Sequence, residues 1–383
     1  MVSDTGGIYL PVVPPCQVSV YGRPLGFVQC RGVRCAHDVK GCGFPVLTVG
    51  SVWLQVPDGV QYSPARASNS LLVVVGKRED NFLSQSGERA RLDVIVNRKP
   101  STDHAASSSR SDRSPLFSVC VPPLFGKLNV LHLVEFVELN RLLGASHFTF
   151  YTFRVSREIS RVLTFYEEAG VARVLPWDLP APNDVWYKGR GLALGDCLFR
   201  NMHLFHYVAF HNLDEFVVPR KVSSWRGLLD TVHAQSENLD TIAAAYELLP
   251  VMFYSAQTEA KLRAGALLSE ASKFLTLRST LRGSVSSANF SKLLVRPDRV
   301  LELDEHHVVQ PISELYVSYQ VDPHTASVHH YRQLTCSPSP KGSAVENCGQ
   351  LSEDRTVWRY KGLLVERTKT VLQRLNRLGA SLT

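Results

Sequence analysis

The segment HNLDEFVVP brings together three side chains whose oxygen atoms could bind a ligand. Asn212, Asp214 and Glu215 stand between two apolar runs, at 207–210 and 216–218. Polar oxygens at the end of buried strands are costly unless each one meets a cation or a hydrogen-bond donor. The motif therefore indicates a site. The alternative is a strand that ends in a capped turn, because Asn and Asp are common turn residues.

Several further motifs accompany this segment in order along the chain. They are CVPPLFG at 120–126, LVEFVELNRLLGASHFTFY at 133–151, Asp196-Cys197 followed by Arg200-Asn201, KLLVRP at 292–297, His306-His307, and His330-Tyr331-Arg332. Together with HNLDEF, they make residues 118–332 resemble glycosyltransferase family 92. The resemblance implies a GT-A fold, an aspartate-rich D-x-D-E-F motif, and transfer of a sugar, typically galactose, from a uridine diphosphate donor.

The resemblance also implies a divalent cation that neutralises the diphosphate as the sugar leaves. Asp214 occupies the last acidic place of the motif and is the expected metal ligand, whereas Asn212 stands where the first aspartate is expected. The Asn212 carbonyl can accept a ribose hydroxyl or a metal-bound water, but it adds no charge. Manganese suits mixed oxygen and imidazole ligands, so one of His306, His307 and His330 is expected to complete the site.

The donor nucleotide would need contacts beyond the metal. Tyr151 ends a predicted strand on the side of the uracil ring, although a buried strand tyrosine is the alternative and Thr152 replaces the acidic residue that the family often has next. Lys188 and Arg190 could meet the diphosphate, or could be surface charges ahead of a helix. The general base stays open among four carboxylates: Glu215, Asp304, Glu305 and Glu314.

Two classes of function follow from the resemblance. The first is an active, inverting, metal-dependent hexosyltransferase that uses UDP-galactose, with Asp214 and Glu215 as catalytic residues and a glycan on a glycoprotein or glycolipid as acceptor. The second is a non-catalytic relative that binds glycan or nucleotide, as the departures at Asn212 and Thr152 would suggest. We favour the first; the acceptor, the linkage and the oligomeric state stay open.

The fold class predicted is α/β, with a mixed sheet of GT-A type flanked by helices and preceded by a small β-rich domain. We divide the chain into a β-rich region at 1–97, a Ser-rich linker at 98–115, a glycosyltransferase domain at 116–335 and a C-terminal segment at 336–383. Apolar periodicity predicts strands at 116–121, 147–153 and 171–175, with helices at 131–143 and 156–170. The ligand site should lie at the carboxyl ends of these strands.

The net charge of +7 is concentrated near the C-terminus. Residues 355–377 hold seven Lys or Arg against one acid, which gives 7 − 1 = +6. This segment has a helical apolar stripe at Val357, Tyr360, Leu364, Val371, Leu375 and Leu378. A helix of this kind docks by its apolar face or lies on an anionic membrane, and we expect it to dock. No basic motif with interleaved aromatics is present, so we expect no nucleic-acid partner.

Eight cysteines are spread along the chain. Cys30, Cys35 and Cys42 with His37 lack the tight spacing of zinc sites, so disulfides are the expected use, and reduced buried cysteines are the alternative. One sequon begins at Asn289. These features agree with the Golgi lumen or membrane, where members of the family work. No stretch of 18 apolar residues marks an anchor helix, so we expect either a chain that begins inside the lumenal part or an anchor that the sequence does not reveal.

Overall fold

The computed structural model describes the chain in stretches. These are residues 116–177, 186–202, 204–236, 238–254, 270–285, 290–332 and 351–377, together with six short strands at 15–20, 23–29, 70–75, 88–93, 336–337 and 346–347. The chain divides into two compact units, one made of residues 1–98 with 179–192 and the other of 99–178 with 193–383. Each unit is described by itself. The predicted linker at 98–115 lies outside the described residues.

The first unit contains a four-stranded antiparallel sheet in the order β2-β1-β3-β4. Its strands are β1 Pro15–Val20, β2 Arg23–Gln29, β3 Ser70–Val75 and β4 Glu88–Asp93. This sheet gives the N-terminal region the β-rich character predicted from its sequence.

The second unit is built around a seven-stranded mixed sheet in the order β16-β10-β13-β8-β5-β6-β7. Strands β8, β5, β6 and β7 run parallel, and β13 is antiparallel to both β8 and β10. The strands are β5 Phe117–Leu124, β6 Ala145–Thr152, β7 Ala172–Pro176, β8 Tyr207–Phe210, β10 Ala243–Leu248, β13 Lys292–Val295 and β16 Val317–Gln320.

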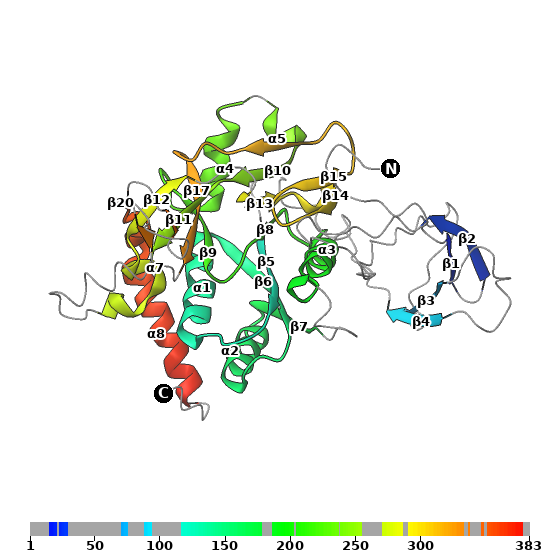
Figure 1. Cartoon of the computed structure of the whole chain (residues 1–383), viewed down its shortest axis with the longest axis horizontal. Helices are drawn as coiled ribbons and strands as arrows, with labels where there is room; N and C mark the ends of the chain where they lie inside the picture. The colour runs from blue at the N-terminus through cyan, green and yellow to red at the C-terminus, as the bar shows by residue number, and fades with distance from the viewer. Residues whose placement is uncertain are drawn as a thin grey trace, which may run out of the picture. The chain divides into compact units, whose positions relative to one another are not determined.

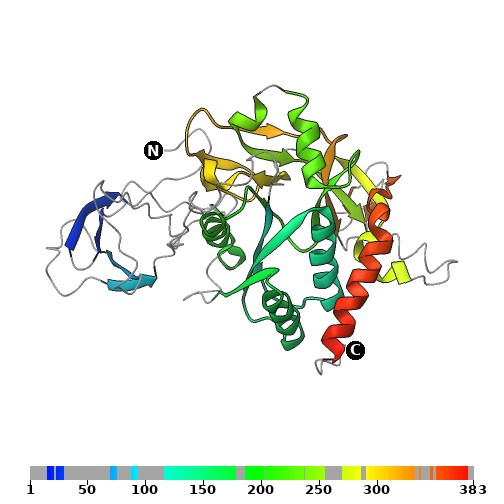
Figure 2. The same cartoon turned by 180° about the vertical axis from the view of Figure 1, so that it is seen from behind.

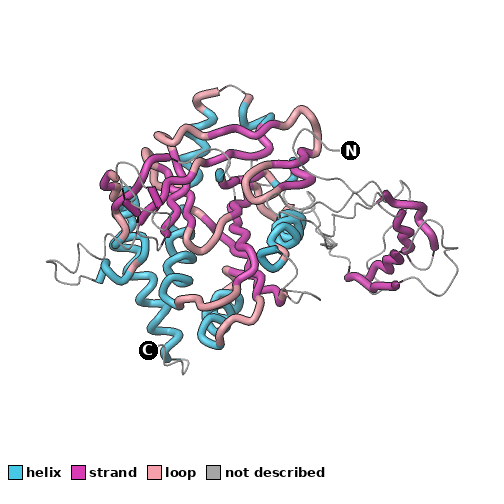
Figure 3. Tube along the Cα trace, in the orientation of Figure 1, coloured by secondary structure: helices cyan, strands magenta, loops and turns pink. Residues whose placement is uncertain are grey.

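Helices cover both faces of this sheet (Figures 1 and 3). Helices α1 (Val130–Leu143) and α2 (Arg157–Glu168) pack on one face, where β5 and β6 present Val119, Phe148 and Phe150. Helix α3 (Arg190–Asn201) and the paired strands β14 (Val300–Leu303) and β15 (Val308–Pro311) pack on the other face, against Cys120 and Tyr151. The side chains alternate because successive strand residues point to opposite faces. The layered mixed sheet confirms the α/β class predicted from the sequence.

The predicted elements of the βαβ unit match the structure within a few residues. Helix α1 begins after Asn129, whose side chain accepts a hydrogen bond from the His132 amide, and ends at Gly144, whose φ of 123° only glycine adopts readily. The helices are α1 Val130–Leu143, α2 Arg157–Glu168, α3 Arg190–Asn201, α4 Trp225–His233, α5 Leu239–Ile242, α7 Leu275–Arg278 and α8 Lys361–Arg377, with 3₁₀ turns at Trp186–Lys188, Glu270–Lys273, Pro297–Arg299 and Thr356–Tyr360.

A five-stranded sheet in the order β20-β12-β11-β17-β9 completes the second unit. Strand β17 is parallel to β11 and antiparallel to β9. The strands of this sheet are β9 Glu215–Pro219, β11 Pro250–Tyr254, β12 Leu281–Val285, β17 Ala326–Arg332 and β20 Ser352–Glu353. Two further sheets have two strands each: β14 Val300–Leu303 pairs with β15 Val308–Pro311, and β18 Cys336–Ser337 pairs with β19 Glu346–Asn347. Because β8 belongs to the seven-stranded sheet and β9 to the five-stranded sheet, residues 211–214 connect these two sheets.

A buried carboxylate fastens the C-terminal region to this second sheet. The Asp354 side chain is 2% exposed and accepts contacts from Arg220 at 2.9 Å and from Arg282 at 3.0 Å. Burial would raise the pKa of Asp354, but hydrogen bonds from Thr356 and the charges of His329 and Arg220 outweigh it and lower the pKa to about 2. Asp354 is therefore ionised and paired at neutral pH.

Helix α8 docks by its apolar face, as the sequence analysis expected. Leu364, Val371 and Leu375 are buried, and the helix packs beside α1, where it is drawn in red in Figure 2. Leu378, the last residue of the predicted stripe, lies outside the described residues. None of the helices in the described parts of the chain is long and apolar enough to cross a membrane.

Cys120 and Cys197 form a disulfide that ties β5 to α3. The two cysteines are 77 residues apart in the sequence. This pair agrees with the expected use of cysteines in disulfides. The zinc alternative at Cys30, Cys35, Cys42 and His37 lies outside the described residues, and so does the sequon at Asn289.

Candidate functional site

The HNLDEF segment forms a tight turn where the two large sheets of the second unit meet. Strand β8 ends at Phe210, opposite Cys120 of the parallel strand β5. The Glu215 amide donates to the Asn212 carbonyl at 3.1 Å, and the Tyr331 amide donates to the Asp214 carbonyl at 2.8 Å. The turn is thus held by its own backbone and by β17. It lies at the carboxyl end of β8, the edge predicted for the ligand.

His330 lies between the two acidic side chains of this turn. Its Nε2 atom is 3.4 Å from Asp214 Oδ2, and its Nδ1 atom is 3.6 Å from Glu215 Oε1. The antiparallel pairing of β17 with β9, which sets His330 opposite Glu215, produces this arrangement. Of the three histidines predicted as metal ligands, His330 is the one that the structure brings to Asp214.

The two carboxylates differ strongly in exposure. The Asp214 side chain is 45% exposed, whereas that of Glu215 is 3% exposed. Burial would raise the pKa of Asp214, but the hydrogen bond and charge of His330 outweigh it and leave the pKa below its ordinary value. Burial likewise opposes ionisation of Glu215, whose pKa is nevertheless lowered by the charges of Lys292 and His330. Both groups are therefore anionic at neutral pH.

Lys292, the first residue of β13, pairs with the buried acid. Its Nζ atom is 3.1 Å from Glu215 Oε2 and donates to Glu305 Oε1 at 2.5 Å. Glu215 Oε2 also accepts a hydrogen bond from the backbone amide of Asn212 at 2.9 Å. Lys292 was not among the site residues predicted from the sequence. The signal that could have found it is a lysine at the start of an otherwise apolar strand, because lysine is rarely buried without a partner.

His211 begins the motif but lies in the core. Its ring packs edge-on against Phe136, with centroids 5.5 Å apart, and burial lowers its pKa to about 4. Its Nε2 atom has no hydrogen-bond partner among the described residues. His211 is therefore neutral at pH 7 and packs beneath the turn.

His306 and His307 stand in a different turn. Asp304 Oδ1 accepts the His306 amide at 2.7 Å and the His307 amide at 2.6 Å. The His306 ring lies 2.7 Å from the Ser291 carbonyl through Nδ1 and packs edge-on near Phe290. One oxygen of Asp304, a candidate base, thus caps this turn.

The described residues hold no group of three or more His, Cys, Asp or Glu side chains arranged to bind a metal. Two donors do fit a divalent cation: the Asp214 carboxylate and the His330 imidazole, 3.4 Å apart. One carboxylate oxygen and one imidazole nitrogen are donors that several divalent metals accept. A cation at this site would therefore need further ligands from outside this pair.

Tyr151 lies at the same edge of the sheet, two strands from β8. It is buried, packs edge-on against Trp177 at 4.9 Å, and donates through its hydroxyl to Asp196 Oδ2 at 2.7 Å. Arg200 Nε donates to the same oxygen at 2.5 Å. Burial and the Asp196 charge raise the pKa of Tyr151 far above its usual range. The Asp196 partner was not predicted from the sequence, and contact of Tyr151 with a uracil ring stays a prediction.

Lys188 and Arg190 belong to the first compact unit. Arg190 lies over the Tyr187 ring at 4.9 Å, and Lys188 has a φ of 55°. Their predicted contacts with a diphosphate stay predictions.

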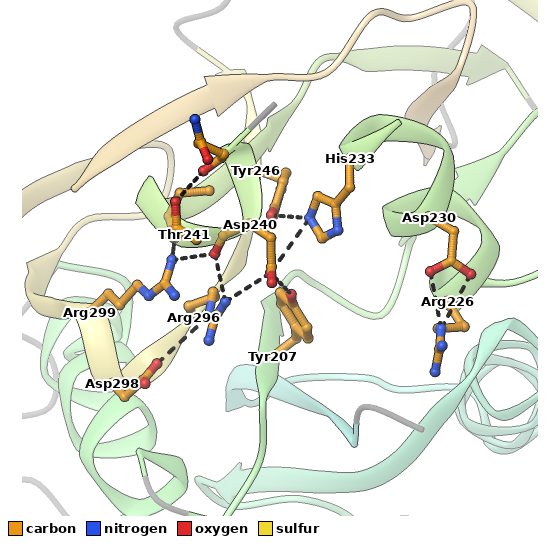
Figure 4. A network of polar contacts seen from close by, with 12 residues as sticks. Tyr207, Arg226, Asp230, His233, Asp240, Thr241, Tyr246, Arg296, Asp298 and Arg299 are labelled. Atoms are coloured by element: carbon orange, nitrogen blue, oxygen red, sulfur yellow. Dashed lines mark hydrogen bonds and ion pairs between the residues drawn. The ribbon is translucent and has the colours of Figure 1, made fainter. Parts of the chain in front are cut away.

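A second polar network lies at the opposite end of β8, around Tyr207, and is shown in Figure 4. Arg296 Nη1 donates to Asp240 Oδ1 at 3.0 Å, and His233 Nε2 lies 2.6 Å from the Tyr246 hydroxyl. Arg299 donates to the Asp240 carbonyl at 2.8 Å. These contacts fasten α5 to the start of the strand, away from the HNLDEF turn.

Comparison with known proteins gives the chain its context. The family model for glycosyltransferase family 92 matches residues 116–363, more than half of the chain. Beta-1,4-galactosyltransferase galt-1 of Caenorhabditis elegans is 29% identical over 219 residues, which are 56% of this chain and 48% of that protein. A second Caenorhabditis elegans protein of the family is 26% identical over 118 residues, which are 28% of this chain and 23% of that protein.

The chain thus spans less than half the length of these two relatives. Among solved structures, the crystal structure of S. aureus TarS is similar at a TM-score of 0.25 and 13% identity, over 41% of this chain and 23% of that one. A TM-score this low carries no argument about function.

Proposed function

The chain belongs to glycosyltransferase family 92, and from that premise we propose that it transfers a hexose, specifically galactose, from a UDP-sugar to a glycan acceptor. The observation that carries the proposal is the exposed Asp214 carboxylate with His330 beside it at 3.4 Å, at the carboxyl end of β8. This edge is where open α/β sheets bind their ligands. The name of the 29% identical relative supports galactose as the sugar.

Asp214 and His330 would hold the cation, which we propose to be Mn²⁺. When bound, Mn²⁺ supplies positive charge that stabilises the departing diphosphate. The anionic state of Asp214 suits this role, because its pKa lies below the ordinary value. Asn212, in the same turn, would contact the donor through its side-chain amide.

We propose inversion at the anomeric carbon. The relative is named as a beta-1,4-galactosyltransferase, and a β-linked product formed from the α-linked sugar of a UDP donor requires inversion. An inverting reaction needs a base that takes the proton of the acceptor hydroxyl. Glu215, Asp304, Glu305 and Glu314 are the candidates for this base, and Oδ1 of Asp304 also caps the turn of His306 and His307.

The acceptor we propose is a glycan on a glycoprotein or glycolipid, in the lumen of the Golgi. The buried disulfide between Cys120 and Cys197 supports an oxidising compartment. The second candidate function is a non-catalytic relative that binds nucleotide or glycan. Asn212 favours it, because an amide in place of the expected aspartate removes one negative charge from the turn.

The experiment is a transfer assay with purified protein, radiolabelled UDP-galactose and a panel of glycan acceptors, with Mn²⁺ and with a chelator. We expect labelled product with Mn²⁺ and none after chelation. Parallel reactions with UDP-glucose and UDP-N-acetylglucosamine test the choice of sugar. Tight UDP binding without transfer to any acceptor in the panel would favour the non-catalytic relative, and a protein that binds no UDP would contradict both functions.

A further inference from the structure

A buried ion pair lies directly beneath the proposed cation site. The Lys292 side chain is 4% exposed and the Glu215 side chain is 3% exposed, and their charged atoms are 3.1 Å apart. Removing two charges from water is expensive, and an apolar pair of similar volume is often as stable or more stable. Stability alone therefore gives no reason for a lysine and a glutamate at these positions.

Both oxygens of Glu215 face groups that define the site. Oε2 accepts the Asn212 amide at 2.9 Å, which holds the first residue of the turn. Oε1 lies 3.6 Å from Nδ1 of His330. Lys292 also lies against Oε2, and the Glu215 side chain is 3% exposed, so this carboxylate is poorly placed to take a proton from an acceptor hydroxyl at the surface.

The orientation of His330 follows from the same contacts. Each ring nitrogen of His330 faces a carboxylate, Nε2 toward Asp214 and Nδ1 toward Glu215. If a cation took Nε2 as a ligand, the hydrogen of the neutral ring would sit on Nδ1, opposite Glu215 Oε1. Histidines that bind metals commonly donate their second nitrogen to a carboxylate in this way. Glu215 is thus placed to turn the His330 nitrogen toward the cation.

We propose that Glu215 and Lys292 are positioning residues: the buried pair fixes the turn of residues 212–214 and the ring of His330, and it leaves Asp214 as the carboxylate offered to the cation. The inference rests on the proposed function. It gives Lys292 a role. It also makes Glu215 a residue that supports the donor site, instead of the base that takes the proton of the acceptor hydroxyl. Glu305, which also binds Lys292, holds the lysine from its other side.

The test separates positioning from stability with three variants: Glu215→Leu, Lys292→Met and the double variant. Urea unfolding measures stability, and calorimetry measures UDP binding in the presence of Mn²⁺. Lys292→Met should be the less stable single variant, because it leaves the buried Glu215 charge without its cation, whereas in Glu215→Leu the lysine keeps its contact with Glu305. The double variant should regain most of the stability lost in Lys292→Met, since the buried Glu215 charge is gone. Its UDP affinity should nevertheless stay about 10- to 100-fold below wild type, the usual cost of losing a group that orients a metal ligand.

Asp354→Asn is the matched control. It also removes a buried carboxylate charge with a close cationic partner, in the same unit. It should lower stability and leave the UDP affinity unchanged, because Asp354 contacts neither the turn nor His330 in the described structure.

Each outcome decides between the alternatives. A wild-type protein that binds no UDP with Mn²⁺ would refute the proposed function itself. A wild-type protein that binds, together with a double variant that binds equally well, would refute positioning alone. Should the double variant not fold, Glu215→Gln takes its place. This variant keeps the shape of the side chain and removes its charge. Wild-type UDP affinity in Glu215→Gln would equally overturn the inference.

Discussion

Asp214→Ala tests the proposed cation site most directly. The Asp214 side chain is 45% exposed and its contact with His330 is 3.4 Å long, so the lost interaction is that of a partly exposed pair, worth about 1 kcal/mol or less. The fold should therefore survive. The effect on the cation is larger, because the substitution removes one of the two protein donors. Loss of an outer partner of a metal ligand typically costs about 10- to 100-fold in metal affinity, so loss of the ligand should cost at least about 100-fold.

The assay compares Asp214→Ala with Asp230→Ala in UDP binding with Mn²⁺, in galactose transfer and in thermal unfolding. Asp230 is a matched control: its side chain is 61% exposed and pairs with Arg226 at 3.1 Å on α4. We expect near wild-type unfolding for both variants, and loss of binding and transfer only in Asp214→Ala. Turnover close to wild type in Asp214→Ala would refute the assignment of this carboxylate to the cation.

Three further predictions concern the turn, the C-terminal anchor and the disulfide. Asn212→Asp should tighten Mn²⁺ binding by restoring a negative charge, and calorimetry that shows no gain would place Asn212 away from the cation. Asp354→Asn should cost about 2 kcal/mol at neutral pH, because a pKa of about 2 against an ordinary 3.8 corresponds to that free energy. Since the folded pKa is the lower one, this stability is present above about pH 4 and lost as pH falls through about 2, where urea unfolding of variant and wild type should converge. Cys197→Ala should lower the free energy of unfolding by about 4.5 kcal/mol, the chain-entropy value for a closed loop of 77 residues, and an effect of similar size in reductant would confirm that the bond is the cause.

Local patterns in the sequence predicted the elements well, because they depend on neighbours in the chain. Apolar spacing located α1 and β6, and the cap residues Asn129 and Gly144 explain where α1 begins and ends. The parallel order of β8, β5 and β6 then places the HNLDEF turn and the end of Tyr151's strand at one edge, as expected for an α/β sheet.

The composition of the site depended on distant pairing that the sequence did not reveal. His306, His307 and His330 were equal candidates, and only the register of β17 against β9 sets His330 opposite Glu215. Lys292 reaches the same carboxylate because β13 lies beside β8, with Leu293 opposite Phe210. Such contacts join residues that are far apart in the chain, and motif spacing carries no information about their register.

The charges around the turn indicate how cation and nucleotide would depend on each other. Lys292 neutralises Glu215, and Asn212 contributes no charge, so Asp214 is the carboxylate of the turn whose charge is offered to a cation. One carboxylate and one imidazole make a weak site for manganese, because the described residues add no third ligand of these types. The diphosphate of a UDP-sugar would supply the missing oxygens and negative charge. The site is therefore better suited to bind the metal together with the nucleotide than to bind the metal alone. In the absence of both, the buried Lys292–Glu215 pair keeps the donors Asp214 and His330 aligned.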